Sequence, residues 1–268
     1  MDEKEINSKE VQRKQFILNH NNWVVILSLS WPIALGMLLQ AGFNIADMKF
    51  VSMIGKVEMA AVGAVNVTFF FVLSIIQMIG IGTISLISRF FGLKRYDAVG
   101  NVLKSSIYLI TVISLSISIV TFIFARNIVG ILGANSPALI QFGTDYIQML
   151  AFGIAPNLIG WIISYGFQGI GDFKTPMIAM LAGTMANLIL DPILIFGFGP
   201  IPSLGVTGAG LATALSQILV FAFLVAKLFN RKSLFAQKMK AEMSKHIKFT
   251  LNPIHWIKQI EFNIIGQI

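Results

Sequence analysis

The chain has 268 residues, of which 56% are hydrophobic and 12% are charged, and it carries a formal net charge of +8 with no cysteine. Soluble domains contain about a quarter charged residues. The low charged fraction and the mean hydropathy of +0.78 therefore predict an integral membrane protein. The lack of cysteine excludes disulfides, thiolate catalysis and cysteine-bound metals.

The N-terminal residues 1–22 mix both charge signs and contain no short apolar core, so they are predicted to be a cytoplasmic tail and not a cleavable signal peptide. A helix needs about 20 apolar residues to cross a bilayer. Six such blocks follow, at residues 23–50, 60–88, 107–124, 147–167, 177–198 and 204–229. Because these blocks are continuously apolar and do not alternate, they predict helices and not barrel strands. We therefore expect an all-α fold, with a six-helix transmembrane lobe over residues 23–230.

The basic residues predict the orientation of this lobe. Most of the 20 lie in the tail, in the second-to-third and fourth-to-fifth connections, or after the sixth span, whereas Lys49, Lys56 and Arg126 fall on the opposite side. The positive-inside rule then places both termini in the cytoplasm of a multi-pass plasma (inner) membrane protein. This charge excess is attributed to topology and to anionic membrane lipid, because no nucleic-acid motif accompanies it. Residues 231–268 are predicted to be a basic cytoplasmic linker or surface helix that turns apolar near its end, as the start of a truncated seventh span would.

Two predicted spans carry polar residues that share one helix face. A carboxylate at the bilayer centre costs roughly 2.5–3.5 kcal/mol on insertion scales, so such residues are rare without a function. The helical spacings i, i+4, i+7 and i, i+3, i+7 align two stripes. These stripes are Gln40, Asn44 and Asp47 in the first span, and Thr184, Asn187 and Asp191 in the fifth. Together they predict a shared polar cavity; the alternative is that the amides and acids join helices by hydrogen bonds alone.

Pro192 directly follows Asp191 and removes the hydrogen bond that the Leu188 carbonyl would otherwise accept. A free carbonyl beside a carboxylate and an amide suits a small hard cation. Asp191 and Asn187 are therefore candidate Na⁺ ligands, and Pro192 is a candidate hinge.

An enzymatic alternative rests on "GIGD" (169–172) and Tyr96-Asp97, which match the two elements of intramembrane aspartyl proteases. Both aspartates lie in charged cytoplasmic connections, whereas that chemistry needs them inside spans. There is also no GxxxxGK[ST] motif for ATP. We therefore expect no enzyme activity, and no cofactor other than a coupling ion.

Four segments together resemble the MATE (multidrug and toxic compound extrusion) family over residues 23–230. They are "WPIALGMLLQAGFNIADMKFVSMIG", "FGLKRYDAVGN", "FQGIGDFKTPMI" and "NLILDPILIFGFGPIPSLGVTGAGLATALS". The resemblance implies Na⁺- or H⁺-coupled antiport of organic, often cationic, substrates by a twelve-helix fold of two lobes. This chain matches the N-terminal six-helix lobe.

The resemblance also implies a cation-coupling site. Asp47, Asn187 and Asp191 match its elements directly, whereas Tyr146 and Thr213 match a tyrosine and a threonine in the fourth and sixth spans. Lys49 stands where the family has an apolar residue.

Three explanations of the chain length remain: a truncated gene product, which we favour, one half of a split transporter, or a half-size protein that pairs with itself. The expected partners are small organic cations and membrane lipid, together with a second lobe or a second copy. Two other functions are retained: a flippase of lipid-linked oligosaccharides from the same superfamily, and a lone lobe that binds without transporting. The Asn-x-x-x-Asp pair and the few basic residues away from the cytoplasm argue against the flippase.

Overall fold

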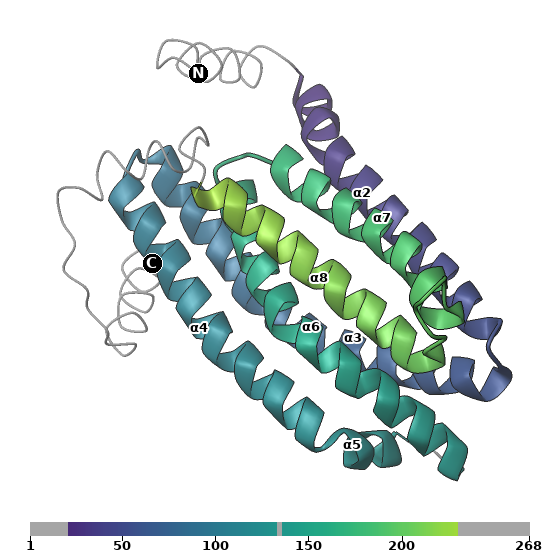
Figure 1. Cartoon of the computed structure of the whole chain (residues 1–268). Helices are drawn as coiled ribbons and strands as arrows, with labels where there is room; N and C mark the ends of the chain where they lie inside the picture. The colour runs from purple at the N-terminus through teal and green to yellow at the C-terminus, as the bar shows by residue number, and fades with distance from the viewer. Residues whose placement is uncertain (1–20, 133–135, 230–268) are drawn as a thin grey trace.

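The computed structural model describes residues 21–132 and 136–229, and within them the chain is a bundle of helices (Figure 1). The predicted N-terminal tail up to residue 20 and the predicted linker after residue 229 lie outside the described residues. The helices are α2 (Asn22–Ser52), α3 (Lys56–Gly92), α4 (Tyr96–Ile123), α5 (Ala125–Ile131), α6 (Pro137–Gly169), α7 (Lys174–Phe196) and α8 (Gly205–Phe229).

Each of the six predicted spans lies largely within one long helix. Four of these, α4, α6, α7 and α8, are long and apolar enough to cross a membrane by length and composition. α2 and α3 have 31 and 37 residues and contain the first two predicted spans. The only β pairing within the described residues is an isolated bridge between Phe198 and Ile201 in the α7–α8 turn. The prediction of an all-α membrane fold is confirmed.

Two helices begin well before their apolar blocks, and one short helix was not predicted. α4 starts at Tyr96 and α6 at Pro137, because polar turns extend each helix beyond the segment that hydropathy marks. The side chain of Ser136 accepts a hydrogen bond from the Leu139 N–H at 3.2 Å and so caps α6. α5 occupies the connection between α4 and α6.

The long helices alternate in direction, so α2 begins and α8 ends at the same end of the bundle (Figure 1). α6 is central and packs against α8, α3 and α4. α7 packs mainly on α8, and α2 mainly on α7. α2 is therefore held chiefly through its contact with α7.

Two apolar clusters fill the bundle at different levels. One includes Ile87 of α3, Leu103 of α4 and Phe167 of α6. The other joins the end of α2 and the start of α3 to α5, α6, α7 and α8, and it contains Tyr146. Tyr146 is 2% exposed, so this second cluster holds a phenol ring whose hydroxyl needs a polar partner.

Glycines on α8 allow the close helix contacts that surround this cluster. A Cβ atom on Gly210 would lie 2.7 Å from the backbone oxygen of Tyr146 on α6, and one on Gly208 would collide with the Leu194 carbonyl of α7. Small residues permit such backbone approach between membrane helices. They let α8 pack closely against both α6 and α7.

Candidate cation-coupling site

The polar stripe on α7 points into the bundle. Thr184 is 8% exposed and Asp191 is 1% exposed, whereas Asn187 is half-buried. The Asn187 amide donates a hydrogen bond to Asp191 Oδ1 at 3.2 Å. One helix turn thus joins the amide and the carboxyl that the spacing placed on one face.

Asp47 brings a second carboxyl from α2. The carboxyl groups of Asp47 and Asp191 lie within hydrogen-bonding reach of each other. Oδ1 of Asp47 is buried and receives no hydrogen bond from the described residues. Two carboxylates can only accept hydrogen bonds, so a direct contact between them requires a proton or a cation.

Tyr146 on α6 completes the cluster together with α3 and α8. Its hydroxyl donates to Oδ1 of Asn66 on α3 at 3.1 Å. The Thr213 side chain on α8 also lies within hydrogen-bonding reach of Tyr146, and both Asp47 and Asp191 are close enough to act on Tyr146 electrostatically. Thr213 Oγ1 donates to the Ala209 carbonyl at 3.1 Å. Residues from five helices therefore meet around one carboxyl pair.

The donor set fits a proton or a small hard cation. The hydroxyl protons of Tyr146 and Thr213 go to neutral carbonyl groups, which leaves their oxygen lone pairs available as ligands. Carboxylate, hydroxyl and carbonyl oxygens are the ligands that hard cations prefer. Among residues 21–132 and 136–229, no group of three or more His, Cys, Asp or Glu side chains comes together.

Pro192 adds a backbone feature beside the carboxyl pair. α7 remains helical through it to Phe196. Because proline has no N–H, the Leu188 carbonyl receives no hydrogen bond from position 192. A helix bends most easily where such a bond is missing.

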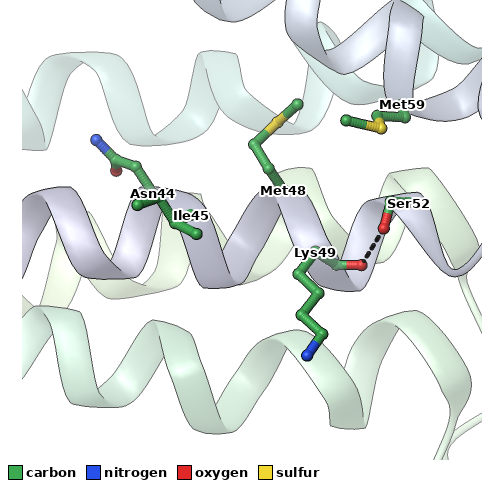
Figure 2. Close-up of a pocket in the computed structure, with 6 residues that line it drawn as sticks. All are labelled: Asn44, Ile45, Met48, Lys49, Ser52 and Met59. Carbon is green, nitrogen blue, oxygen red and sulfur yellow. Dashed lines mark hydrogen bonds between the residues drawn. The ribbon is translucent and has the colours of Figure 1, made fainter.

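Of the three polar residues predicted on one face of the first span, only Asp47 is placed at the site by the structure. Gln40 lies on α2, but its side chain is outside the described part of the chain. Asn44 is exposed and lines an open groove of about 520 Å³ formed by α2 and the start of α3 (Figure 2). The groove residues are Asn44, Ile45, Met48, Lys49, Ser52 and Met59.

Lys49 is exposed at the last turn of α2. Figure 2 shows its side chain extending from the opposite side of the helix to Met48, which points toward Met59. Lys49 is the only charged residue among those that line the groove. Lys49 is therefore available to an approaching ligand.

The two aspartates of the protease-like pattern have other surroundings. Asp172 accepts from the Thr175 N–H at 3.1 Å and from the Thr175 hydroxyl at 2.7 Å, so it caps the start of α7. Asp97 is exposed in the first turn of α4. Neither surrounding resembles a buried pair of carboxyls.

Asn66 is the site residue that the sequence reasoning missed. It lies 80 positions from Tyr146 in the chain, so no helical spacing connects the two. A signal was present, however, because Asn66 is an amide within an apolar block, and intramembrane polar residues are rare without a function.

Comparison with known proteins gives the family of the chain. The family described as MatE matches residues 32–193. The chain is 30% identical over 228 residues to a FAD transporter of Shewanella oneidensis, covering 82% of this chain and 50% of that protein. It is 29% identical over 218 residues to the multidrug export protein MepA of Staphylococcus aureus, covering 80% and 47%. The chain thus spans about half the length of these curated relatives.

Solved structures of membrane transporters also match this chain. A crystal structure of MATE in the bent conformation matches with a TM-score of 0.71 and 30% identity, over 78% of this chain and 46% of that one. A transporter of the MOP superfamily from Pyrococcus furiosus, described as having a binding pocket of reverse polarity, matches with a TM-score of 0.68 and 28% identity, over 78% and 45%. With the family match covering more than half of its residues, this chain belongs to the MATE family of membrane transporters.

Proposed function

We propose that the chain provides the ion-coupling lobe of an antiporter that exports organic solutes in exchange for Na⁺ or H⁺. The observation that carries this proposal is the meeting of Asp47 and Asp191, from α2 and α7, inside an apolar bundle. A carboxyl pair that needs a proton or a cation to stay together is a direct sensor of ion occupancy.

The same pair can convert occupancy into movement. With an ion bound, α2 and α7 are held together at the carboxyl pair. Without it, two like charges repel across the main contact of α2. The missing hydrogen bond at Pro192 lowers the cost of bending α7 at this point. A cargo that binds better to the separated arrangement would compete with the ion, and this differential affinity couples the two.

The cargo is proposed to be an organic cation, as the multidrug function of the MepA relative supports. Lys49 favours a second class, because an exposed basic residue in the lining of an apolar groove suits an amphipathic anion. The Shewanella oneidensis relative is named a FAD transporter. The two classes are separated by measuring export of an ethidium-like cation and of FAD, each alone and with the other added as a competitor. The Lys49→Met variant should weaken the export of FAD but not of ethidium if the anion is the cargo.

The distribution of basic residues supports a cytoplasmic position for one end of the bundle. Arg89, Lys94 and Arg95 lie at the α3–α4 connection, and Lys174 begins α7. These connections lie at the same end as the end of α8 (Figure 1). We place this end at the cytoplasmic surface of the plasma membrane, in contact with anionic lipid.

The test is uphill export by the protein as its gene encodes it, reconstituted in vesicles and driven by an imposed Na⁺ or H⁺ gradient. The parent should move the cargo against its gradient, and Asp191→Asn should abolish this while the protein remains folded. Asp145→Asn is the matched control, because Asp145 lies on α6 and pairs with Gln141 at 3.1 Å. Uphill export that survives Asp191→Asn would refute the proposal. Ion binding without any export would favour a non-transporting lobe.

A further inference from the structure

We propose that Asn66 is a positioning residue of the coupling site: by accepting the hydroxyl proton of Tyr146, it directs the oxygen lone pairs of Tyr146 toward the carboxyl pair. This inference rests on the proposed function, because it concerns the same ion site. It extends that site to α3, a helix from which no coupling residue was predicted.

The packing leaves Tyr146 little freedom except rotation of its hydroxyl. The residue is 2% exposed. Its ring belongs to a cluster with Val62 and Val65 of α3 and with Ala209 of α8. Gly210 brings α8 against the Tyr146 backbone oxygen. With the ring held on several sides, the direction of the O–H bond depends on which acceptor is in reach.

Two kinds of acceptor compete for that single proton. One is the neutral Oδ1 of Asn66, at 3.1 Å. The other is the carboxyl pair of Asp47 and Asp191, which acts on Tyr146 electrostatically. Hydrogen bonds to charged acceptors are roughly twice as strong as neutral ones. A proton donated to the carboxyl pair would therefore stabilise the ion-free site and compete with the ion.

Asn66 reduces this competition, because it is the acceptor to which Tyr146 donates in the structure. Since it takes the proton, the Tyr146 oxygen faces the carboxyl pair as an acceptor, ready to bind a cation or the proton of a carboxylic acid. Thr213 shows the same arrangement, because its hydroxyl donates to the Ala209 carbonyl at 3.1 Å. The hydroxyl groups of Tyr146 and its neighbour Thr213 thus both donate to neutral acceptors, which leaves their oxygens as acceptors for a positive ligand.

A double-mutant cycle separates this role from simple helix packing. Asn66→Leu should raise the concentration of coupling ion that gives half-maximal export by about tenfold, the lower limit for one hydrogen bond to a charged group. The KM for cargo should stay unchanged. In a Tyr146→Phe background, Asn66→Leu should have no further effect, because no hydroxyl remains to be turned.

Thr83→Val is the matched control on the same helix. Thr83 donates to Ser106 at 2.9 Å and so joins α3 to α4. Its loss should leave the ion dependence unchanged. Effects of Asn66→Leu and Tyr146→Phe that simply add, an equal effect of Thr83→Val, or a change in cargo KM alone would each overturn the proposal.

A spectroscopic measurement keeps the proposal testable if Asn66→Leu does not fold. With Tyr96, Tyr108 and Tyr165 replaced by Phe, the infrared C–O stretch of the remaining tyrosine reports whether Tyr146 donates or only accepts a hydrogen bond. We expect a donor signature that persists when the coupling ion is added. An acceptor-only signature would mean that the Asn66 amide is turned around, and this would overturn the inference. A parent protein without ion-driven export would instead refute the proposed function, so the two failures are distinguishable.

Discussion

Replacing Asp47 with asparagine tests the carboxyl pair while preserving its shape. Asp47 Oδ1 is buried and receives no hydrogen bond from the described residues, and the Asp47 carboxyl faces Asp191. The asparagine amide can donate to Asp191, so it would take the place of the proton or cation. We expect a protein that folds normally but no longer responds to the coupling ion in its normal range.

The magnitude follows from what is lost and what is retained. A hydrogen bond or ligand contact to a charged group is worth about 1.5–3 kcal/mol. At 1.4 kcal/mol for each factor of ten, the ion concentration for half-maximal export should rise roughly 10- to 150-fold. Folding should change little, because the variant buries one charge fewer and pairs the other. The unfolding temperature should therefore shift by no more than about 4 °C.

The assay is uphill export in proteoliposomes at increasing concentrations of the driving ion, with the unfolding temperature measured on the same preparations. Asp97→Asn is the matched control, because Asp97 is an exposed acid in the first turn of α4 and its removal should change neither quantity. If neither Asp47→Asn nor Asp97→Asn changes the half-saturating ion concentration, the carboxyl pair is not the coupling site.

Three further variants test the surroundings of the site. Gly210→Leu forces a side chain against the Tyr146 backbone and should destabilise the protein by about 1–3 kcal/mol in thermal unfolding. Gly82→Ala meets no neighbouring atom and should leave the stability unchanged. Equal effects of the two variants on stability would contradict the close packing. Asp172→Ala removes the cap of α7 and should cost about 1 kcal/mol of stability without changing ion dependence; altered ion dependence would give this acid a role in coupling. Thr213→Val keeps the volume but removes an oxygen from the site, so the ion requirement should rise while the unfolding temperature holds, and an unchanged ion requirement would exclude Thr213 as a ligand.

The long helices were predictable because each of the six apolar blocks is long enough for a membrane-spanning helix, and four of the observed helices are long and apolar enough to cross a membrane. The ends of the helices were not predictable in the same way. Hydropathy locates the part of a helix that crosses the membrane, whereas α6 begins at Pro137 behind a Ser136 cap. α5 was missed because its seven residues are too few to form a span and show no separate pattern.

The residues of the candidate site also differ in whether the sequence alone could predict their contacts. Asn187 and Asp191 lie on one helix at a spacing of four, so their hydrogen bond follows from helical geometry alone. Nothing in the sequence pairs Asn66 with Tyr146, because that contact depends on how α3 packs against α6. Local spacing therefore finds the residues that one helix brings together, whereas contacts between helices need the fold.

The carboxyl pair lies at the contact between α2 and α7, where it can act on the position of α2. α8 packs tightly against both α6 and α7, because Gly208 and Gly210 allow the backbones to approach. α2 packs mainly on α7 and much less on α3 and α8. A change in the charge of Asp47 and Asp191 therefore acts at the main attachment of the least-anchored long helix. Under the proposed mechanism, an ion that favours the joined arrangement tenfold would shift that equilibrium by about 1.4 kcal/mol, and α2 would respond because it has few other contacts to resist the shift.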